Sequence, residues 1–516
     1  MTVEAATSDK KWTALIYLAG DNDLSDEMVW GLQEMKKAAS SPLVHEALNL
    51  AVLFDPPRER PRRYDFVAPG LAPPAEADGD LERIETTEYS ADSGGLTASA
   101  LVERFLTERI RELPPTEHYL VILSGHGSGA VGDFLADADP TTTLSIPVLG
   151  KVLDKTKALL QEKVRPGAKI DILGMDSCQM SAIEVAYEMR GSARYLVASE
   201  SLVLETGWPY HRVLQAVGAN PGGSETEVAS AIAGRYLDFY RDYQLAGIST
   251  DISVCELDKL DPVADAVFSL ARALTAPLAR LASDGLEEGV ELGRFERTAR
   301  DPYADRDRTL RDAVVLAHWN AQSYKCDRYV DLYDFAEQLL RFCSRAPNGS
   351  AEQICSASHQ VMDAVRAAVP LSDSIGADFQ HSHGLSIYFP WSSADYLPEY
   401  RNLAFAERTR WRHFLEAYLT ATIRMRRDQS ANVRETKAGE GLVLARNGRE
   451  VRPEEPRRRP PTSLLAKDVD AGTHRDVDAG THRDVDAGTH RDVDAGTHRG
   501  KACRSTMKNP PEGYYQ

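Results

Sequence analysis

Two polar clusters, each at the end of an apolar stretch, contain residue types that can do covalent chemistry. The stretch VILSGHGSG contains His126, and the stretch DILGMDSC ends at Cys178. A thiolate is a strong nucleophile, and an imidazole moves protons readily near neutral pH. If the two stretches are neighbouring strands of a parallel sheet, their carboxyl ends meet at one edge, where ligands usually bind. His126 and Cys178 are therefore predicted to be an acid–base and nucleophile pair.

The residues beside this pair fit the same chemistry. The segment 179–190 is predicted to be a helix, and a thiol at a helix N-terminus has a lowered pKa. The backbone N–H groups of Gly127 and Cys178 are expected to stabilise a developing oxyanion. Asp176 adds a negative charge near the same edge, although an acid at this position can also cap the following helix.

Each of these residues taken alone has an ordinary structural explanation. A buried cysteine is usually inert, and a histidine at a strand end is usually structural. The combination favours an active site, because both side chains are flanked by glycine or small residues. They are also about 50 residues apart, as in caspase-type enzymes, although the local caspase motif is absent. The chain has no P-loop, GxSxG or HExxH motif, so nucleotide, serine-hydrolase and zinc-protease sites are not predicted.

Apolar runs alternate with amphipathic segments in the first 220 residues. This alternation predicts an α/β fold with a mostly parallel sheet that is flanked by helices. A polar excursion after the second run (62–69 and 81–90) is predicted to be a hairpin, and Asp23 and Ser25 to cap the first helix. The predicted strands are 13–21, 49–57, 118–127, 169–176, 194–201, 250–258 and 383–391.

The composition and the predicted secondary structure change at two places along the sequence. We predict an N-terminal tail (1–11), an α/β core that carries His126 and Cys178 (12–220), a mainly helical C-terminal portion (221–428) and a disordered tail (429–516). The tail repeats DVDAGTHR four times between Asp468 and Arg499. Such repeats cannot bury a core, which favours disorder. Their DxDxG motif lacks the third acidic ligand and the terminal Glu of a calcium-binding loop, so a solvated linker is expected.

The overall composition excludes some functions. The formal net charge of -18 argues against general nucleic-acid binding, which needs a basic face. No apolar run reaches the roughly 18 residues of a membrane span, and no secretory h-region is visible. The six cysteines have no CxxC spacing, so neither a disulfide framework nor a metal site is predicted. We expect a cytoplasmic protein with reduced thiols, five of which are structural or incidental.

The motifs together resemble the clostripain family of cysteine peptidases, which belongs to the caspase-like CD clan. The matching stretches are LIYLAGDNDL (15–24), VILSGHGSG (121–129), DILGMDSCQMSAIEVAYEM (171–189), VASESLVLETGWPY (197–210) and GLSIYFP (384–390). They occur in the family's order over residues 12–425. The resemblance implies a caspase-like α/β fold and endopeptidase activity through a His126–Cys178 dyad. It also implies an oxyanion hole from the N–H groups of Gly127 and Cys178.

The resemblance further implies a specificity. Asp176 would line the pocket for the residue before the cut and select Arg or Lys by charge pairing. Thr206 stands where some relatives have an acid, so Arg need not be preferred over Lys. Some members depend on calcium, which leaves calcium open as a cofactor, although the dyad chemistry requires none. Other members are activated at a basic residue between the dyad residues, but segment 134–150 has no Lys or Arg.

These expectations converge on an intracellular, regulated cysteine endopeptidase that acts on proteins or peptides after basic residues. The basic stretch PRRRPP (456–461) and the Arg of each repeat make self-cleavage in the tail a further expectation. The first alternative is a catalytically silent caspase-like module that binds partners. The second is a thiol amidase acting on small molecules, which fits the dyad but not the family motifs.

Overall fold

The computed structural model describes most of the chain up to residue 422. The described residues are 9–68, 70–74, 84–89, 97–132, 134–136, 143–242, 247–283, 302–324, 328–343, 349–422, 444–446 and 449–451. The repeats and nearly all of the predicted tail lie outside these ranges. Within the predicted tail, β12 (Leu444–Arg446) and β13 (Arg449–Val451) form a short antiparallel pair.

A nine-stranded sheet forms the centre of the fold, in the order β10-β8-β7-β6-β5-β1-β2-β3-β4. Its five central strands, β2, β1, β5, β6 and β7, are parallel to one another. All residues of β1 and β2 are buried, as expected for parallel strands that are covered on both faces. The five strands are β1 (Trp12–Ala19), β2 (Leu48–Asp55), β5 (His118–Ser124), β6 (Ile170–Asp176) and β7 (Ala193–Ala198).

Antiparallel strands extend both ends of this sheet. The predicted hairpin is confirmed as β3 (Arg62–Asp65) and β4 (Glu85–Glu88) beside β2. At the other end, β8 (Thr250–Glu256) pairs with β7, and β10 (Leu371–Ile375) pairs with β8. The sequence did not predict β10. Because β8 and β10 belong to the central sheet, the predicted boundary at residue 220 does not coincide with an edge of the sheet.

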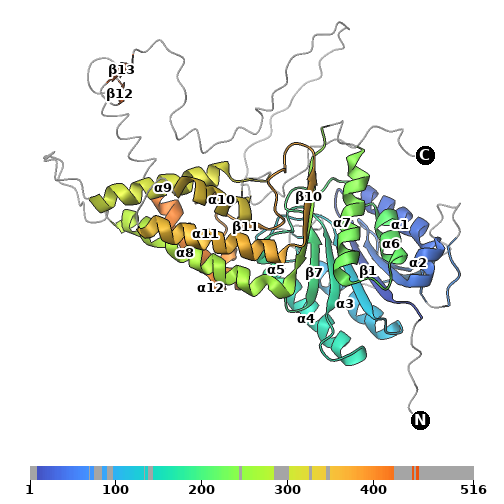
Figure 1. The fold of residues 1–516 in the computed structure, drawn as a ribbon. Coiled ribbons are helices and arrows are strands. Elements are labelled where there is room, and N and C mark those ends of the chain that lie inside the picture. The colour runs from blue at the N-terminus through green and yellow to red at the C-terminus, as the bar shows by residue number, and fades with distance from the viewer. Residues whose placement is uncertain are drawn as a thin grey trace, which may run out of the picture. The chain divides into compact units, whose positions relative to one another are not determined.

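Helices cover both faces of the sheet, which confirms the predicted fold class (Figure 1). One face packs against the apolar side chains of four helices, and the other against those of α3–α5 and of the later helices. The first group is α1 (Ser25–Ala39), α2 (Pro42–Ala47), α6 (Tyr210–Ala219) and α7 (Glu225–Arg241). The second group begins with α3 (Ala98–Glu112), α4 (Ile146–Lys163) and α5 (Ile183–Met189).

The later part of the chain is mainly helical, as predicted. In Figure 1, its helices lie side by side at one end of the fold. A two-stranded sheet, β9 (Tyr329–Asp331) with β11 (Ser386–Tyr388), lies between these helices and the central sheet. Strand β11 is shorter than the strand predicted at 383–391. The helices are α8 (Leu260–Ser283), α9 (Pro302–Asn320), α10 (Leu332–Cys343), α11 (Gly349–Ala368) and α12 (Ala404–Thr409). All described residues up to Ala421 belong to one compact unit.

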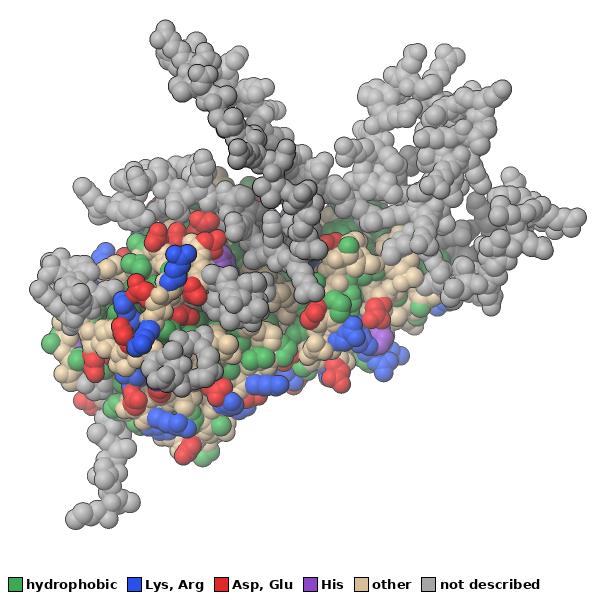
Figure 2. All heavy atoms as spheres, turned by 180° about the vertical axis from the view of Figure 1, so that it is seen from behind, with side chains coloured by type: hydrophobic (Ala, Val, Ile, Leu, Met, Phe, Trp, Pro, Cys, Tyr) green, Lys and Arg blue, Asp and Glu red, His purple; other side chains and the backbone are tan. Residues whose placement is uncertain are grey.

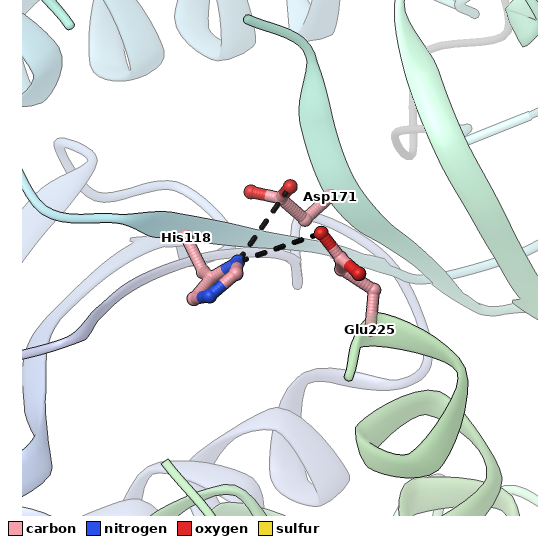
Figure 3. A group of neighbouring side chains, drawn as sticks. All are labelled: His118, Asp171 and Glu225. Carbon is pink, nitrogen blue, oxygen red and sulfur yellow. Dashed lines mark ion pairs between the residues drawn. The ribbon is translucent and has the colours of Figure 1, made fainter. Parts of the chain in front are cut away.

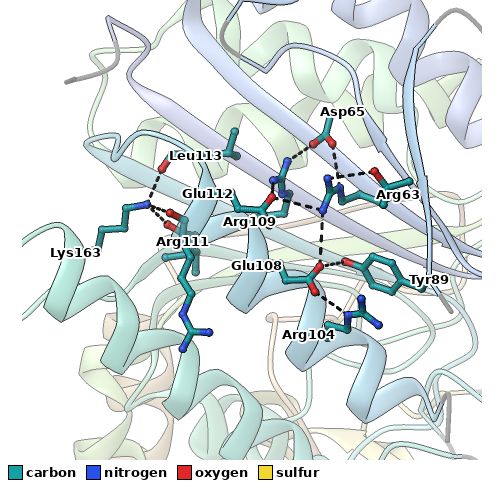
Figure 4. Close-up of polar contacts among 12 residues, drawn as sticks. Arg63, Asp65, Tyr89, Arg104, Glu108, Arg109, Arg111, Glu112, Leu113 and Lys163 are labelled. Carbon is teal, nitrogen blue, oxygen red and sulfur yellow. Dashed lines mark hydrogen bonds and ion pairs between the residues drawn. The ribbon is translucent and has the colours of Figure 1, made fainter. Parts of the chain in front are cut away.

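A network of charged groups attaches the β3–β4 hairpin to α3 (Figure 4). Asp65 on β3 forms ion pairs with Arg63 and with Arg109 of α3, and all three side chains are buried. The hydroxyl of Tyr89 donates a hydrogen bond to Glu108 at 2.8 Å. Because a buried charge is tolerated only when it is paired, these contacts fix the hairpin in its position at the edge of the sheet.

The surface carries charges of both signs. On the face seen in Figure 2, the acidic and basic side chains of the described residues are interspersed. Among the helices of the described residues, none has the length and apolar character needed to cross a bilayer.

Candidate active site

His126 and Cys178 lie beside one cavity at the carboxyl edge of the sheet. Strand β5 ends two residues before His126, and β6 ends two residues before Cys178. The two strands are parallel neighbours, with Ser124 aligned to Asp176. The structure therefore confirms the condition on which the predicted pairing depended. Both side chains line a cavity of about 290 Å³.

Gly127 packs directly on the backbone of Cys178. A Cβ atom at this position would lie 2.5 Å from the carbonyl oxygen of Cys178 and 3.1 Å from its nitrogen. Any larger residue would push the two loops apart, so a glycine is required here. The two backbone segments predicted to form an oxyanion hole are thus brought into contact.

Cys178 lies in a turn and not at a helix N-terminus, so this prediction is wrong. Helix α5 begins only at Ile183. Before it, Gln179 adopts φ 61° and its N–H bonds to the Ser201 carbonyl at 2.8 Å. The N–H of Ser181 likewise bonds to Ser199 at 2.9 Å. These bonds hold the segment against the end of β7 instead of letting the helix start early. Since the helix dipole acts within about one turn, it gives Cys178 little support.

Asp23 contacts the candidate histidine. Its Oδ1 atom lies 2.6 Å from Nε2 of His126. The sequence predicted Asp23 or Ser25 as the cap of α1, and this is wrong: the cap position is Leu24, with no side-chain cap. The Asn22 side chain instead accepts the Leu24 N–H at 2.9 Å. Because β1 is the neighbour of β5, the residues after both strands reach the same edge.

Asp176 is the buried acid of the cavity. Its side chain is 4% exposed, and Oδ2 accepts hydrogen bonds from Ser124 (2.9 Å), the Trp208 N–H (3.2 Å) and the Tyr210 hydroxyl (2.8 Å). Burial raises the pKa of this carboxyl group, and the three hydrogen bonds oppose the rise. With α5 beginning at Ile183, the alternative role of Asp176 as a helix cap is excluded.

The second oxygen of Asp176 has a different environment. Oδ1 is buried and has no hydrogen-bond partner among the described residues. Gly207, at φ 65°, passes so close that a Cβ there would lie 2.8 Å from one carboxylate oxygen. A glycine at this position therefore leaves room around the carboxylate. Gly207 and Asp176 both line the cavity.

Further acids surround the same cavity. Asp23 and Glu205 line it together with Asp176. Thr206 does not line it; its hydroxyl lies 2.7 Å from that of Tyr240. Glu205, the residue before Thr206, does line the cavity. The described cavity has three acidic side chains and no lysine or arginine, which makes it attractive to cations.

The C-terminal portion supports both candidate loops. The Tyr329 hydroxyl, on β9, accepts the N–H groups of Ala130 (2.8 Å) and Val131 (3.3 Å) in the loop after His126. On the other side, Ser386 of β11 donates its N–H to the carbonyl of Ser181 at 2.9 Å. Sequence patterns contained no signal for these contacts, because each joins segments roughly 200 residues apart.

Two of the other described cysteines have environments unlike that of Cys178. Cys255 and Cys343 are fully buried, and burial raises the pKa of the Cys255 thiol and that of Cys343, the latter to about 12. Such thiols stay protonated and unreactive. Cys255, Cys343 and Cys355 are all free thiols.

The fold and the chemistry of this edge define a class, the caspase-like cysteine peptidases. Residues 16–418 match the clostripain family, and the chain belongs to this family. It is therefore a cysteine protease, and the predicted family is confirmed. No curated protein matches the chain.

Two solved structures are similar in fold. One is a secreted C11 cysteine protease from Bacteroides thetaiotaomicron in complex with an irreversible peptide inhibitor. It is 19% identical, with a TM-score of 0.52, over 78% of this chain and 99% of that one. The other is the same organism's secreted C11 protease called iotapain, at 14% identity and a TM-score of 0.50, over 78% and 99%. At these identities the likeness concerns the fold.

Proposed function

We propose that the chain is an endopeptidase in which Cys178 is the nucleophile and His126 the general acid and base. The observation that carries this proposal is the shared cavity at the carboxyl edge, which both side chains line. We place its action inside the cell, in a regulated role. The free thiols of Cys255, Cys343 and Cys355 support a reducing compartment.

The reaction follows from these positions. His126 takes the thiol proton, and the thiolate of Cys178 attacks the carbonyl carbon of the scissile peptide bond. The N–H groups of Gly127 and Cys178 donate hydrogen bonds to the resulting oxyanion. His126 returns the proton to the leaving amine, which departs and leaves a thioester. Water, deprotonated by His126, then attacks the thioester and releases the acid and the free thiol.

Asp23 is a positioning residue in this proposal. Its contact with Nε2 favours the tautomer in which that nitrogen carries the proton, because a carboxylate only accepts hydrogen bonds. The other ring nitrogen, Nδ1, is then unprotonated and can act as the base. Asp23 thereby orients the ring in the way that carboxylates orient histidines in other hydrolases.

The variant Asp23→Asn is expected to lower kcat by about 10- to 100-fold, with KM nearly unchanged. An asparagine amide can donate to Nε2, which favours the wrong tautomer. Steady-state kinetics on a peptide substrate measure the effect, with Asp26→Asn as the matched control, since Asp26 is a nearby exposed acid in the first turn of α1. Equal kinetics for the two variants would remove Asp23 from the mechanism.

The proposed specificity is for Arg or Lys before the cut. Asp176 supports it, since its buried Oδ1 has no hydrogen-bond partner among the described residues and its cavity is lined by acids. A guanidinium or ammonium group entering the cavity supplies the missing donor and a compensating charge. An acidic side chain would face repulsion from all three carboxylates.

A panel of fluorogenic peptides tests the function. The peptides carry Arg, Lys, Ala or Asp before the scissile bond and are offered with and without calcium. Hydrolysis after Arg or Lys supports the proposal, and a calcium requirement would add a cofactor that the dyad chemistry does not need. Preference for Asp contradicts the assigned role of Asp176. Turnover of no peptide favours the silent binding module.

The tail is proposed as a substrate of the enzyme itself. Its basic stretch, 456–461, and the Arg of each repeat lie outside the described residues but offer the residue types that the cavity selects. We expect purified wild-type protein to accumulate fragments cut after these residues, and the Cys178→Ala protein to remain intact. Mass spectrometry of the two samples decides, and identical fragment patterns would assign the cuts to another protease.

A further inference from the structure

Three side chains with metal-binding atoms meet at the opposite edge of the sheet (Figure 3). His118 is the first residue of β5, Asp171 the second of β6 and Glu225 the first of α7. The catalytic loops follow the other ends of β5 and β6. Since a seven-residue strand is about 20 Å long, this cluster is separate from the active site.

The geometry of the cluster is compact. Nδ1 of His118 lies 3.7 Å from Oδ1 of Asp171 and 3.8 Å from Oε1 of Glu225. All three atoms lie within 4.8 Å of one another. The ring of Trp12 stacks on that of His118, with centroids 4.7 Å apart, which fixes the imidazole orientation.

Two of these atoms lack hydrogen-bond partners although they are buried. Asp171 is 1% exposed, and its Oδ2 accepts the Tyr119 N–H at 2.8 Å, but its Oδ1 has no hydrogen-bond partner among the described residues. The same holds for Nδ1 of His118. A buried polar atom without a partner is unfavourable. Nδ1 of His118 also lies near the carboxylate of Glu225.

One cation is already near the cluster. The Nε atom of Arg194 lies 3.5 Å from Oδ1 of Asp171, beyond a good hydrogen bond, and is itself without a hydrogen-bond partner among the described residues. The Arg194 side chain is 32% exposed, so it can turn toward solvent. The competing explanation for the cluster is a set of ion pairs without a metal, from Asp171 to Arg194 and from a protonated His118 to Asp171 and Glu225.

We propose that His118, Asp171 and Glu225 bind a divalent transition-metal ion of the zinc type. One imidazole and two carboxylates are common zinc ligands, with a water in the fourth position. Ligand atoms on a tetrahedral zinc ion are about 3.4 Å apart, so the observed 3.7 and 3.8 Å need only small shifts. Calcium and magnesium prefer oxygen ligands alone. The bound ion would link β5, β6 and α7, two of which carry the catalytic loops.

Zinc itself is the probe, added to the full-length chain after chelator treatment. All proteins carry Cys178→Ala, because a reactive thiol also binds zinc. Zinc is expected to raise the Tm by several degrees, by binding the folded state. Adding Glu225→Gln, which keeps the Ser224 and Glu227 cap of α7 intact, is expected to abolish most of that rise.

The matched control is Glu117→Gln. This exposed acid precedes His118 and pairs with Lys11, outside the cluster. The histidines of the tail repeats also bind zinc, so the difference between the two variants, and not the total zinc bound, is the measurement. Equal zinc-induced shifts in both variants would overturn the proposal, as would no shift in either, or a larger shift with calcium than with zinc.

Discussion

The Cys178→Ala protein is expected to hydrolyse peptides at least about 10³-fold more slowly than the wild-type chain. Without the thiol there is no nucleophile to form the thioester, and the oxyanion hole and cavity alone give only weak catalysis. Alanine is smaller than cysteine and leaves the turn geometry unchanged, so the Tm should differ little. The measurement is kcat/KM on the best Arg or Lys peptide.

A second cysteine provides the control. Cys355 is a half-buried free thiol on α11, far along the chain from the cavity, and alanine suits a helix. The Cys355→Ala protein should retain full activity and the same sensitivity to thiol alkylation. If Cys178→Ala retained activity, or if both variants lost it equally, Cys178 would not be the nucleophile.

The variant Asp176→Asn is expected to lower kcat/KM for Arg and Lys peptides by about 10²- to 10⁴-fold. Removing one partner of a buried charge pair costs about 3–5 kcal/mol, which corresponds to this range. Asparagine retains the size of aspartate and an oxygen that can accept the bonds from Ser124 and Tyr210. The fold and the nearby turn should therefore survive, and kinetics across the peptide panel isolate the effect of charge.

The substrate itself supplies the best control for this variant. Hydrolysis of the peptide with Ala before the cut should change little, because its side chain makes no charge pair. Asp154→Asn, which removes a carboxylate on α4 that pairs with Lys157, controls for net charge. A uniform loss across all peptides would indicate damage to the Cys178 loop, and no loss would place the specificity pocket elsewhere.

Local sequence patterns predicted the central sheet well. The five apolar runs became β1, β2, β5, β6 and β7 within a few residues of their predicted ends. Such runs are recognisable because parallel strands are buried on both faces. Strand β10 was missed because its sequence, LSDSI, is polar and mostly half-buried at the edge of the sheet. The early start predicted for α5 was wrong because hydrogen bonds to Ser199 and Ser201 outweigh local helix propensity.

Some residues of the candidate site could be predicted from the sequence, and others could not. His126, Cys178 and Asp176 stand out because each lies at or just after the end of a buried strand. Asp23 was interpreted as a helix cap, since an acid before a helix usually is one. Its contact with His126 spans 103 residues, and only the pairing of β1 with β5 makes it visible. The cluster of His118, Asp171 and Glu225 also lacks any sequence motif.

The sequence by itself determined which residues end the buried strands and therefore which side chains reach the catalytic edge. This information is local, because a buried strand and the glycines of the turn after it can be recognised within a short segment of the sequence. Only the tertiary structure decided how those side chains are held. Asp23 contacts His126, Tyr210 contacts Asp176, and Tyr329 supports the loop after His126. Each contact depends on strand order and on helices that return from distant parts of the chain, and no local pattern encodes that order.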